Sequence, residues 1–139
     1  MKAMGLDVGT CTIGVATSDP LGLTAQGVEV IQRGDLVQDL FRLGELMDEY
    51  EIECVVVGIP INMNGTYGPA AEEARRFADL IRKEFGKPVY EEDERLTTVA
   101  AERVLLEANL SRQRRRQVID KVAASLILQS FLARRNNKD

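Results

Sequence analysis

The sequence predicts an α/β fold, a mixed five-stranded sheet with helices on both faces. Three observations support this prediction. Residues 3–17 alternate apolar with small or polar side chains, as in a hairpin; residues 54–59 form a short, branched apolar run typical of a central strand; and helical and strand patterns alternate after residue 35. A length of 139 residues, of which 45% are apolar, fits one domain over residues 1–139.

The first three strands are expected as a meander. Residues 3–8 alternate large apolar with small side chains, which predicts a strand with Asp7 on the face of the small residues. Gly9–Cys11 predicts a turn, and Thr12–Thr17 the returning strand. Val28–Ile31 is expected as the third strand.

Helices and strands alternate in the remainder. Asp35, with Gln38 three residues later, resembles a capping box and predicts a helix that runs to about Glu51. Cys54–Ile59 is continuously apolar, so we expect a strand covered on both faces.

A long polar loop then leads to Pro69, which sits where the first residue of a helix would, and Gly86 ends that helix. Val89–Arg95 predicts the fifth strand. A helix from about Thr97 to Leu106 and a final helix from Ser111 complete the chain.

The composition excludes several kinds of chemistry. The chain has no histidine, which removes Ser-His and Cys-His triads, HNH-type nucleases and His-ligated zinc. Any chemistry must use carboxylates, hydroxyls, a lysine or a metal. Cys11 and Cys54 are too few for a disulfide framework. Because no apolar run is long enough for a membrane span or a signal peptide, we expect a soluble, cytoplasmic protein.

The charge is unevenly divided along the chain. Residues 1–110 hold ten Lys and Arg against twenty Asp and Glu, a net −10, whereas residues 111–139 hold eight against two, a net +6. A charge run is usually a solvated face. A basic end beside an acidic body would also suit docking on phosphates, and we expect this role for the tail.

Asp7 is the first candidate for chemistry. A carboxylate in an apolar strand costs several kcal/mol unless it is paired or holds a metal. Hydrogen bonds from the hydroxyls of Thr10 or Thr12 would satisfy it without any function. The spacing from Asp7 to Thr10 also matches a phosphate-binding hairpin.

Two further acidic positions stand out. Glu91–Glu94 is a run of four acids on a predicted strand, so its even-numbered acids face one side and its odd-numbered acids the other. For any one of these acids, a solvated strand end with Arg95 paired to a neighbour is the simpler explanation. Asp120 lies where an apolar helix face meets the basic end, and a pairing with Lys121 or Arg116 would also account for it.

Together, the three positions suggest phosphoryl-transfer chemistry. Two-metal sites need several carboxylates from separate elements to hold two divalent ions about 4 Å apart. In such sites one metal activates a water and the other stabilises the leaving oxygen, so no histidine is needed. From the residues alone, RNA and DNA substrates stay equally open.

Several motifs resemble the YqgF-type pre-16S rRNA nuclease family, which is also described as Holliday-junction-resolvase-like and has an RNase H-like fold. The matches follow one another in order over nearly the whole chain. They are Gly5–Thr10, Ile13–Ala16, Ser18–Pro20, Val57–Pro60 with Asn62–Gly65, Asp93–Thr98 and Ile119–Ser125. The family commonly has basic residues just after Gly9-Thr10, where this chain has Cys11 and Thr12.

The resemblance implies a metal-dependent nuclease that acts on structured RNA, with maturation of the 5′ end of 16S ribosomal RNA as the family's role. It implies Asp7, Glu94 and Asp120 as the catalytic, metal-binding acids, with Mg²⁺ or Mn²⁺ as cofactor and Asp93 as an alternative to Glu94. We expect a monomer or weak homodimer without membrane contact. The candidate substrate-binding residues are Thr10, Asn62, Asn64, Arg95, Thr97, Arg114, Arg115, Arg116 and Lys121.

Three other functions compete with this interpretation. One is a non-catalytic nucleic-acid-binding module that kept the fold, and another is a Holliday-junction DNA resolvase. The third is an ATP-binding relative of actin and the sugar kinases, whose first hairpin also carries an Asp-x-Gly-Thr loop. That superfamily needs two lobes, whereas this chain has length for one.

Overall fold

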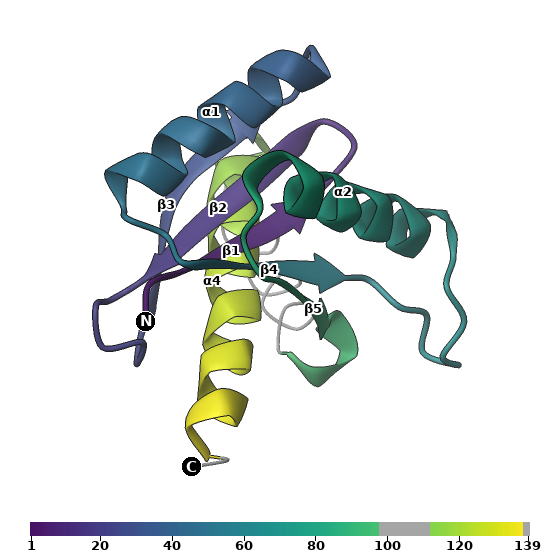
Figure 1. Ribbon diagram of the computed structural model, residues 1–139. Coiled ribbons are helices and arrows are strands. Elements are labelled where there is room, and N and C mark those ends of the chain that lie inside the picture. The colour runs from purple at the N-terminus through teal and green to yellow at the C-terminus, as the bar shows by residue number, and fades with distance from the viewer. Residues whose placement is uncertain (98–111, 138–139) are drawn as a thin grey trace.

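The computed structural model describes residues 1–97 and 112–137, with side chains of the second range described for residues 119–136. One five-stranded sheet has the order β3-β2-β1-β4-β5 (Figure 1). β1 runs antiparallel to β2 and parallel to β4, so the predicted mixed sheet is confirmed. The strands are β1 (Ala3–Val8), β2 (Thr12–Ser18), β3 (Ala25–Gln32), β4 (Cys54–Ile59) and β5 (Val89–Asp93).

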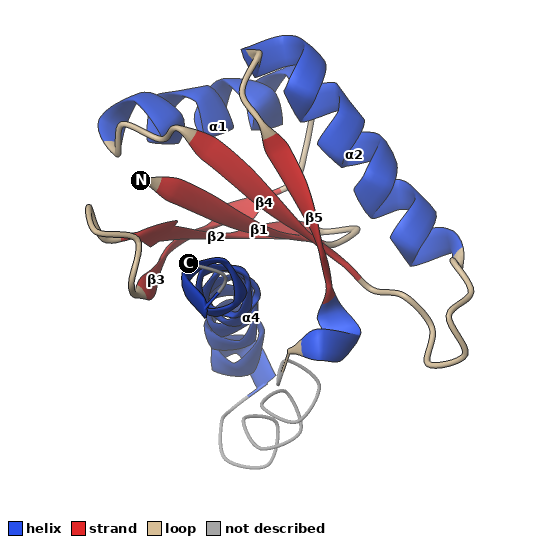
Figure 2. Ribbon diagram, turned by 60° about the horizontal axis from the view of Figure 1, so that its bottom comes forward, coloured by secondary structure: helices blue, strands red, loops and turns tan. Residues whose placement is uncertain are grey.

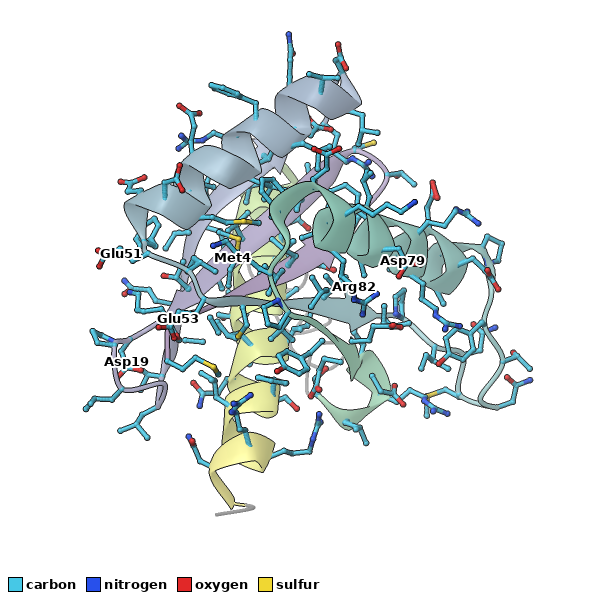
Figure 3. All side chains as sticks on the ribbon, viewed as in Figure 1. Met4, Asp19, Glu51, Glu53, Asp79 and Arg82 are labelled. Atoms are coloured by element: carbon cyan, nitrogen blue, oxygen red, sulfur yellow. The ribbon has the colours of Figure 1, made fainter. Side chains whose placement is uncertain are left out.

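Helices cover both faces of the sheet, as predicted. Figure 2 shows α1 (Leu36–Glu49) and α2 (Pro69–Phe85) on one side and α4 (Arg112–Asn137) on the other. Strand alternation divides the core accordingly. Met4, labelled in Figure 3, belongs to the cluster under α1 and α2, whereas Ala3 and Val56 belong to the cluster under α4.

Local signals account for the ends of α1 and α2. The carboxylate of Asp35 accepts a hydrogen bond from the backbone N–H of Val37 at 2.9 Å, which confirms Asp35 as the N-cap of α1. Pro69 is the first residue of α2. Gly86 ends α2 in the left-handed conformation, at φ 63°, which favours glycine.

Two predicted strands have different bounds in the structure. β3 begins at Ala25, three residues before the predicted start at Val28. β5 ends at Asp93 and not at Arg95, because the Asp93 carboxylate accepts a hydrogen bond from the backbone N–H of Arg95 and caps a 3₁₀ turn, η1 (Glu94–Leu96). The helix predicted from Thr97 to Leu106 and the boundary at Ser111 lie outside the described residues.

The backbone of α4 lies unusually close to the sheet. A Cβ atom at Gly14 of β2 would lie 2.1 Å from the carbonyl oxygen of Asp120, and one at Gly5 of β1 would lie 2.9 Å from that of Ala124. A Cβ atom at Gly27 of β3 would lie 3.0 Å from the carbonyl oxygen of Lys121. Glycines on three neighbouring strands therefore let α4 approach the sheet more closely than side chains would allow.

None of the helices in the described part of the chain is long and apolar enough to cross a membrane.

Candidate active site

Asp7 lies near the end of β1, on the face that α4 covers. Alternation along β1 places it on the same side as Ala3 and Gly5, both of which lie under α4. Its partner in the antiparallel ladder is Gly14 of β2. On the other side, Leu6 pairs with Val57, so Gly58 of β4 comes next to Asp7. The half-buried Asp7 thus lies between two glycines on the neighbouring strands.

Asp120 reaches the same face from α4. Its backbone packs directly on Gly14, the ladder partner of Asp7. The Thr12 hydroxyl donates a 2.7 Å hydrogen bond to Asp120 Oδ2. Of the alternatives for this acid, a pair with Arg116 falls on a side chain outside the described residues, and Thr12 is a candidate donor to Asp7 by sequence. The structure instead directs the Thr12 proton to Asp120, across 108 residues of sequence.

Glu94 comes to this face through the 3₁₀ turn η1. Its Oε2 lies 3.1 Å from the position that a Cβ atom of Gly58 would occupy, so the carboxylate lies over β4 beside the end of β1. Both the backbone N–H and the hydroxyl of Thr97 donate to the Glu94 carbonyl, at 3.1 and 2.7 Å. Absence of a side chain at Gly58 leaves the space that Glu94 occupies.

Asp93, the alternative to Glu94, has Arg95 as the partner of its side chain. Its carboxylate forms an ion pair with Arg95 at 2.7 Å. The Arg95 guanidinium, as a hydrogen-bond donor, holds the pKa of Asp93 below its usual range. The turn at Asp93 therefore separates the two acids, one held by Arg95 and the other placed over Gly58.

Asp7, Glu94 and Asp120 thus come from three elements to neighbouring positions on one face. Carboxylate oxygens are the ligands that Mg²⁺ and Mn²⁺ prefer, so the donor set fits such an ion in its chemistry. Among the described residues, however, no group of three or more His, Cys, Asp or Glu side chains is arranged so that it could hold a metal ion. A shared ion would require side-chain rearrangement, with Asp120 binding through the oxygen that Thr12 does not engage.

A cleft of about 270 Å³ opens beside Asp120. The β1–β2 turn forms one wall, with Thr10 and Cys11 both exposed, and β3 forms the other wall. The predicted substrate contact Thr10 lines this cleft. Lys121 is exposed beside a neighbouring depression on β3 that Glu29 also lines, where the Arg42 hydrogen bond and, to a smaller extent, the Lys121 charge lower the pKa of Glu29.

Arg33 fastens the β1–β2 turn. Its Nη1 donates to the Gly9 carbonyl at 2.8 Å, and its backbone N–H donates to the Cys11 carbonyl at 2.9 Å. The guanidinium lies 5.3 Å from the centroid of the Phe77 ring on α2. This residue was missed from the sequence, because an arginine between a strand and a helix gives no local signal of contact with a turn 24 residues earlier.

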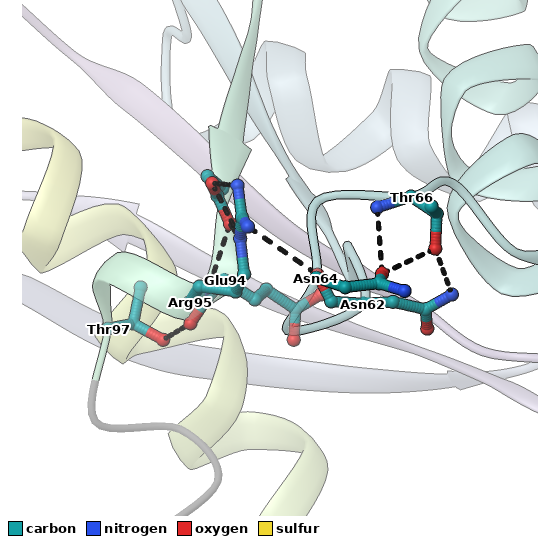
Figure 4. A network of polar contacts seen from close by, with 7 residues as sticks. Asn62, Asn64, Thr66, Glu94, Arg95 and Thr97 are labelled. Carbon is teal, nitrogen blue, oxygen red and sulfur yellow. Dashed lines mark hydrogen bonds and ion pairs between the residues drawn. The ribbon is translucent and has the colours of Figure 1, made fainter.

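The loop after β4 is folded on itself next to η1 (Figure 4). Asn64 Oδ1 accepts from both the backbone N–H and the hydroxyl of Thr66, and Asn62 Nδ2 donates to that same hydroxyl at 3.0 Å. Arg95 Nη1 donates to the Asn62 carbonyl at 3.5 Å. The predicted substrate contacts Asn62, Asn64 and Arg95 therefore lie together beside the turn that carries Glu94, with the two asparagines linked through Thr66 and Arg95 bonded to Asn62.

A buried ion pair also joins β5 to α4. Glu92 is fully buried, and both of its carboxylate oxygens accept hydrogen bonds from the guanidinium of Arg134. The pairing raises the pKa of Arg134. Although the basic tail was expected to contact phosphates, Arg134 has an intramolecular partner. Arg114, Arg115 and Arg116 lie on α4, but their side chains are outside the described residues.

The fold and its acidic face define the class to which the chain belongs. It is similar to the solved structure of Thermus thermophilus RuvC in complex with a Holliday junction substrate, with a TM-score of 0.61 and 18% identity, covering 98% of this chain and 96% of that chain. At this identity the likeness shows the fold alone. The fold is the RNase H-like fold of the RuvC type, which confirms the predicted fold class.

The family follows from the sequence comparisons. A family model described as "RuvX: Holliday junction resolvase" matches residues 1–134. A relative from Moorella thermoacetica is 63% identical over 134 residues, 96% of each chain, and one from Geobacillus sp. WCH70 is 57% identical over 136 residues, 95% of this chain and 97% of that one. Both bear the name "Putative pre-16S rRNA nuclease". The chain belongs to the RuvX family, and the resemblance seen in its motifs is confirmed.

Proposed function

We propose that this protein is a divalent-metal-dependent endonuclease that cleaves phosphodiester bonds in precursor 16S ribosomal RNA during maturation of its 5′ end. The observation that supports this most is the placement of Asp7 on β1, Glu94 on η1 and Asp120 on α4, all on one face of the sheet. The names of the relatives point to the same substrate. We place the reaction in the cytoplasm and treat residues 1–139 as one nuclease domain, acting as a monomer or weak homodimer.

In this proposal the three acids hold Mg²⁺ or Mn²⁺. When bound, such an ion supplies a positive charge that stabilises the negative charge building up on the phosphate. Thr12 orients the carboxylate of Asp120 by its hydrogen bond. Thr97 fixes the backbone of Glu94 by two hydrogen bonds to its carbonyl, so that the acid side chain stays over Gly58.

The substrate would pass along the cleft beside Asp120. Thr10 lines this cleft, and Lys121 is exposed beside the neighbouring depression on β3. Arg114, Arg115 and Arg116 precede Lys121 on α4 and would contact phosphates, a role that the basic end of an otherwise acidic chain supports. Asn62, Asn64, Arg95 and Thr97 would contact the RNA on the other side of Glu94.

A second substrate deserves the same test because the family model bears the description of a Holliday junction resolvase. Cleavage of a labelled precursor 16S RNA is compared with cleavage of a four-way DNA junction, each with Mg²⁺, Mn²⁺ or a chelator. Cleavage of the RNA that the chelator abolishes is the expected result. Junction cleavage alone would reassign the substrate to DNA, and binding without any cleavage would indicate a non-catalytic module.

Matched acid variants test the site in the same assay. Asp7→Asn, Glu94→Gln and Asp120→Asn are expected to lose cleavage and keep their circular dichroism spectra. Glu91→Gln and Asp79→Asn are the controls, because Glu91 pairs with Arg75 of α2 and Asp79 with Arg82, away from the α4 face. Cleavage at the wild-type rate by all three site variants would refute the assignment.

A further inference from the structure

An apolar groove is lined by residues of α1 and α2. Figure 2 shows these two helices on the opposite face of the sheet from α4. The volume of the groove is about 520 Å³, within the size range of pockets that receive ligands or anchor side chains. Leu40 and Phe85 line it and pack on the core beneath. Gly44 leaves room for the Phe85 ring, because a Cβ atom there would lie 3.2 Å from Phe85 Cε1. The groove therefore has an apolar lining built from both helices.

Two large apolar side chains at this groove are left in water. Val37 is 72% exposed and Phe41, one helical turn later, is 69% exposed. The core-facing stripe of α1 is already complete, since Leu43, Leu46 and Met47 are buried. Val37 and Phe41 thus add nothing to the core of the fold, and paired exposed apolar residues beside a groove are typical of an interaction site.

The charges around the groove indicate the chemistry of its partner. The polar residues that line it are Glu45, Asp48 and Glu84, all of them acids. Glu45 has Arg42 as a neighbour at 3.3 Å, whereas within the described part of the chain Asp48 and Glu84 have no ion pair. The acids would repel RNA phosphates. In a symmetric contact between two copies, the same acids would also face one another.

We propose that this groove docks a basic amphipathic helix of a protein partner. The apolar face of that helix would place side chains at i, i+3 or i+4, and i+7 along the groove over Phe41 and Phe85, and its lysines or arginines would pair with Asp48 and Glu84. Because α4 and the candidate active site lie on the other face of the sheet, a partner bound here leaves the nucleic-acid surface free. The proposal is independent of the nuclease assignment.

The probe is a stapled helical peptide of about 20 residues, with leucines at i, i+3, i+4 and i+7 and lysines elsewhere. One control peptide scrambles the same residues, and another replaces the lysines by glutamates. Titration of the labelled full chain by NMR gives the affinity and the residues affected. We expect the basic peptide to change the NMR signals of α1 and the end of α2 only. Neither control peptide is expected to bind.

Two double variants test whether the peptide binds at this groove. Val37→Ser with Phe41→Ser is expected to weaken the basic peptide at least about tenfold, the loss typical of removing a central apolar anchor. Leu21→Ser with Met63→Ser removes equally exposed apolar residues elsewhere, at 76% and 87% exposure, and should bind as the wild type does. Both double variants are surface changes, and circular dichroism checks their folding.

Three results would overturn the proposal. The first is peptide-induced changes on α4 or spread over the whole surface. The second is equal binding by the Val37→Ser/Phe41→Ser variant and the wild type. The third is a concentration-dependent dimer that the Phe41→Ser variant abolishes, which would assign the groove to a second copy of this chain. None of these measurements uses cleavage, so failure of the nuclease assignment would leave them unchanged.

Discussion

Replacing Gly14 by alanine tests the close contact that places Asp120 over the sheet. The new methyl group would lie 2.1 Å from the carbonyl oxygen of Asp120 and 2.8 Å from its carbonyl carbon. Real Cβ atoms essentially never come closer than 3.0 Å to such an atom, so α4 must move away by about 0.9 Å, the difference between the two distances. The atoms in the way are backbone, which cannot turn aside as a side chain would.

The size of the effect follows from that displacement. Overpacking of this kind costs about 1–3 kcal/mol of the free energy of unfolding. A misplacement of about 1 Å near the reacting groups lowers the rate about 100-fold. Urea denaturation followed by circular dichroism measures the first quantity, and RNA cleavage at a temperature where both proteins are folded measures the second.

Gly34→Ala is the matched control. Nothing lies within 4 Å of a Cβ atom at Gly34, so the same change there should alter the free energy of unfolding by no more than about 1 kcal/mol. Its cleavage rate should equal that of the wild type. If Gly14→Ala unfolds at the wild-type urea concentration and cleaves at the wild-type rate, α4 does not rest on β2 as described, and the reasoning fails.

Three further predictions concern the polar contacts made by Thr12, Arg134 and Arg95. Thr12→Val should lower the cleavage rate at least about tenfold, because valine cannot donate to Asp120, whereas Thr12→Ser should keep the rate because the serine hydroxyl still can. A steady-state cleavage assay, with circular dichroism to check folding, tests this. Arg134→Ala should cost about 3–5 kcal/mol in urea denaturation, since it leaves the buried Glu92 carboxylate without its partner, and an equal midpoint would contradict it. The lowered pKa of Asp93 means that its pair with Arg95 stabilises the fold at neutral pH and loses this effect as the pH falls through the lowered pKa. Arg95→Ala should therefore destabilise the protein at pH 7, and this difference should shrink as the pH falls through the lowered pKa of Asp93. An NMR titration of the Asp93 carboxyl should give a higher pKa in the variant than in the wild type.

Much of the fold was predictable because its signals are local. The alternation in residues 3–8, the branched apolar run of β4 and the proline that starts α2 each depend on neighbours within one element. The cap at Asp35 is likewise a contact over two residues. Such signals persist whatever the rest of the chain does, so the predicted order of strands and helices in the described residues is confirmed.

The end of β5 was predicted wrongly for a local reason as well. The run of four acids and Arg95 contains no glycine or proline, so the sequence carries no signal that ends the strand before Arg95. The Asp93 side chain instead bonds the backbone N–H of Arg95 and turns the chain into η1. This turn directs Glu94 over Gly58, a placement that strand alternation alone does not reveal.

Contacts between distant segments were not predictable from one sequence. The hydrogen bond from Thr12 to Asp120 spans 108 residues, and the pair of Glu92 with Arg134 spans 42. Each residue alone is compatible with a solvated or capping role, and its partner becomes evident when α4 is packed on the sheet. The candidate acids could be chosen by type and family resemblance, whereas their second contacts required the structure.

The central claim, that Asp7, Glu94 and Asp120 form one metal site, is tested most directly by anomalous diffraction from a crystal soaked in Mn²⁺. One or two Mn²⁺ peaks are predicted on the α4 face at the end of β1, each about 2 Å from carboxylate oxygens of at least two of the three acids. Asp120 is expected to bind the ion through Oδ1 while Oδ2 keeps its hydrogen bond from Thr12. A well-ordered crystal with no peak at these acids, or with Mn²⁺ bound elsewhere on the chain, would contradict the account.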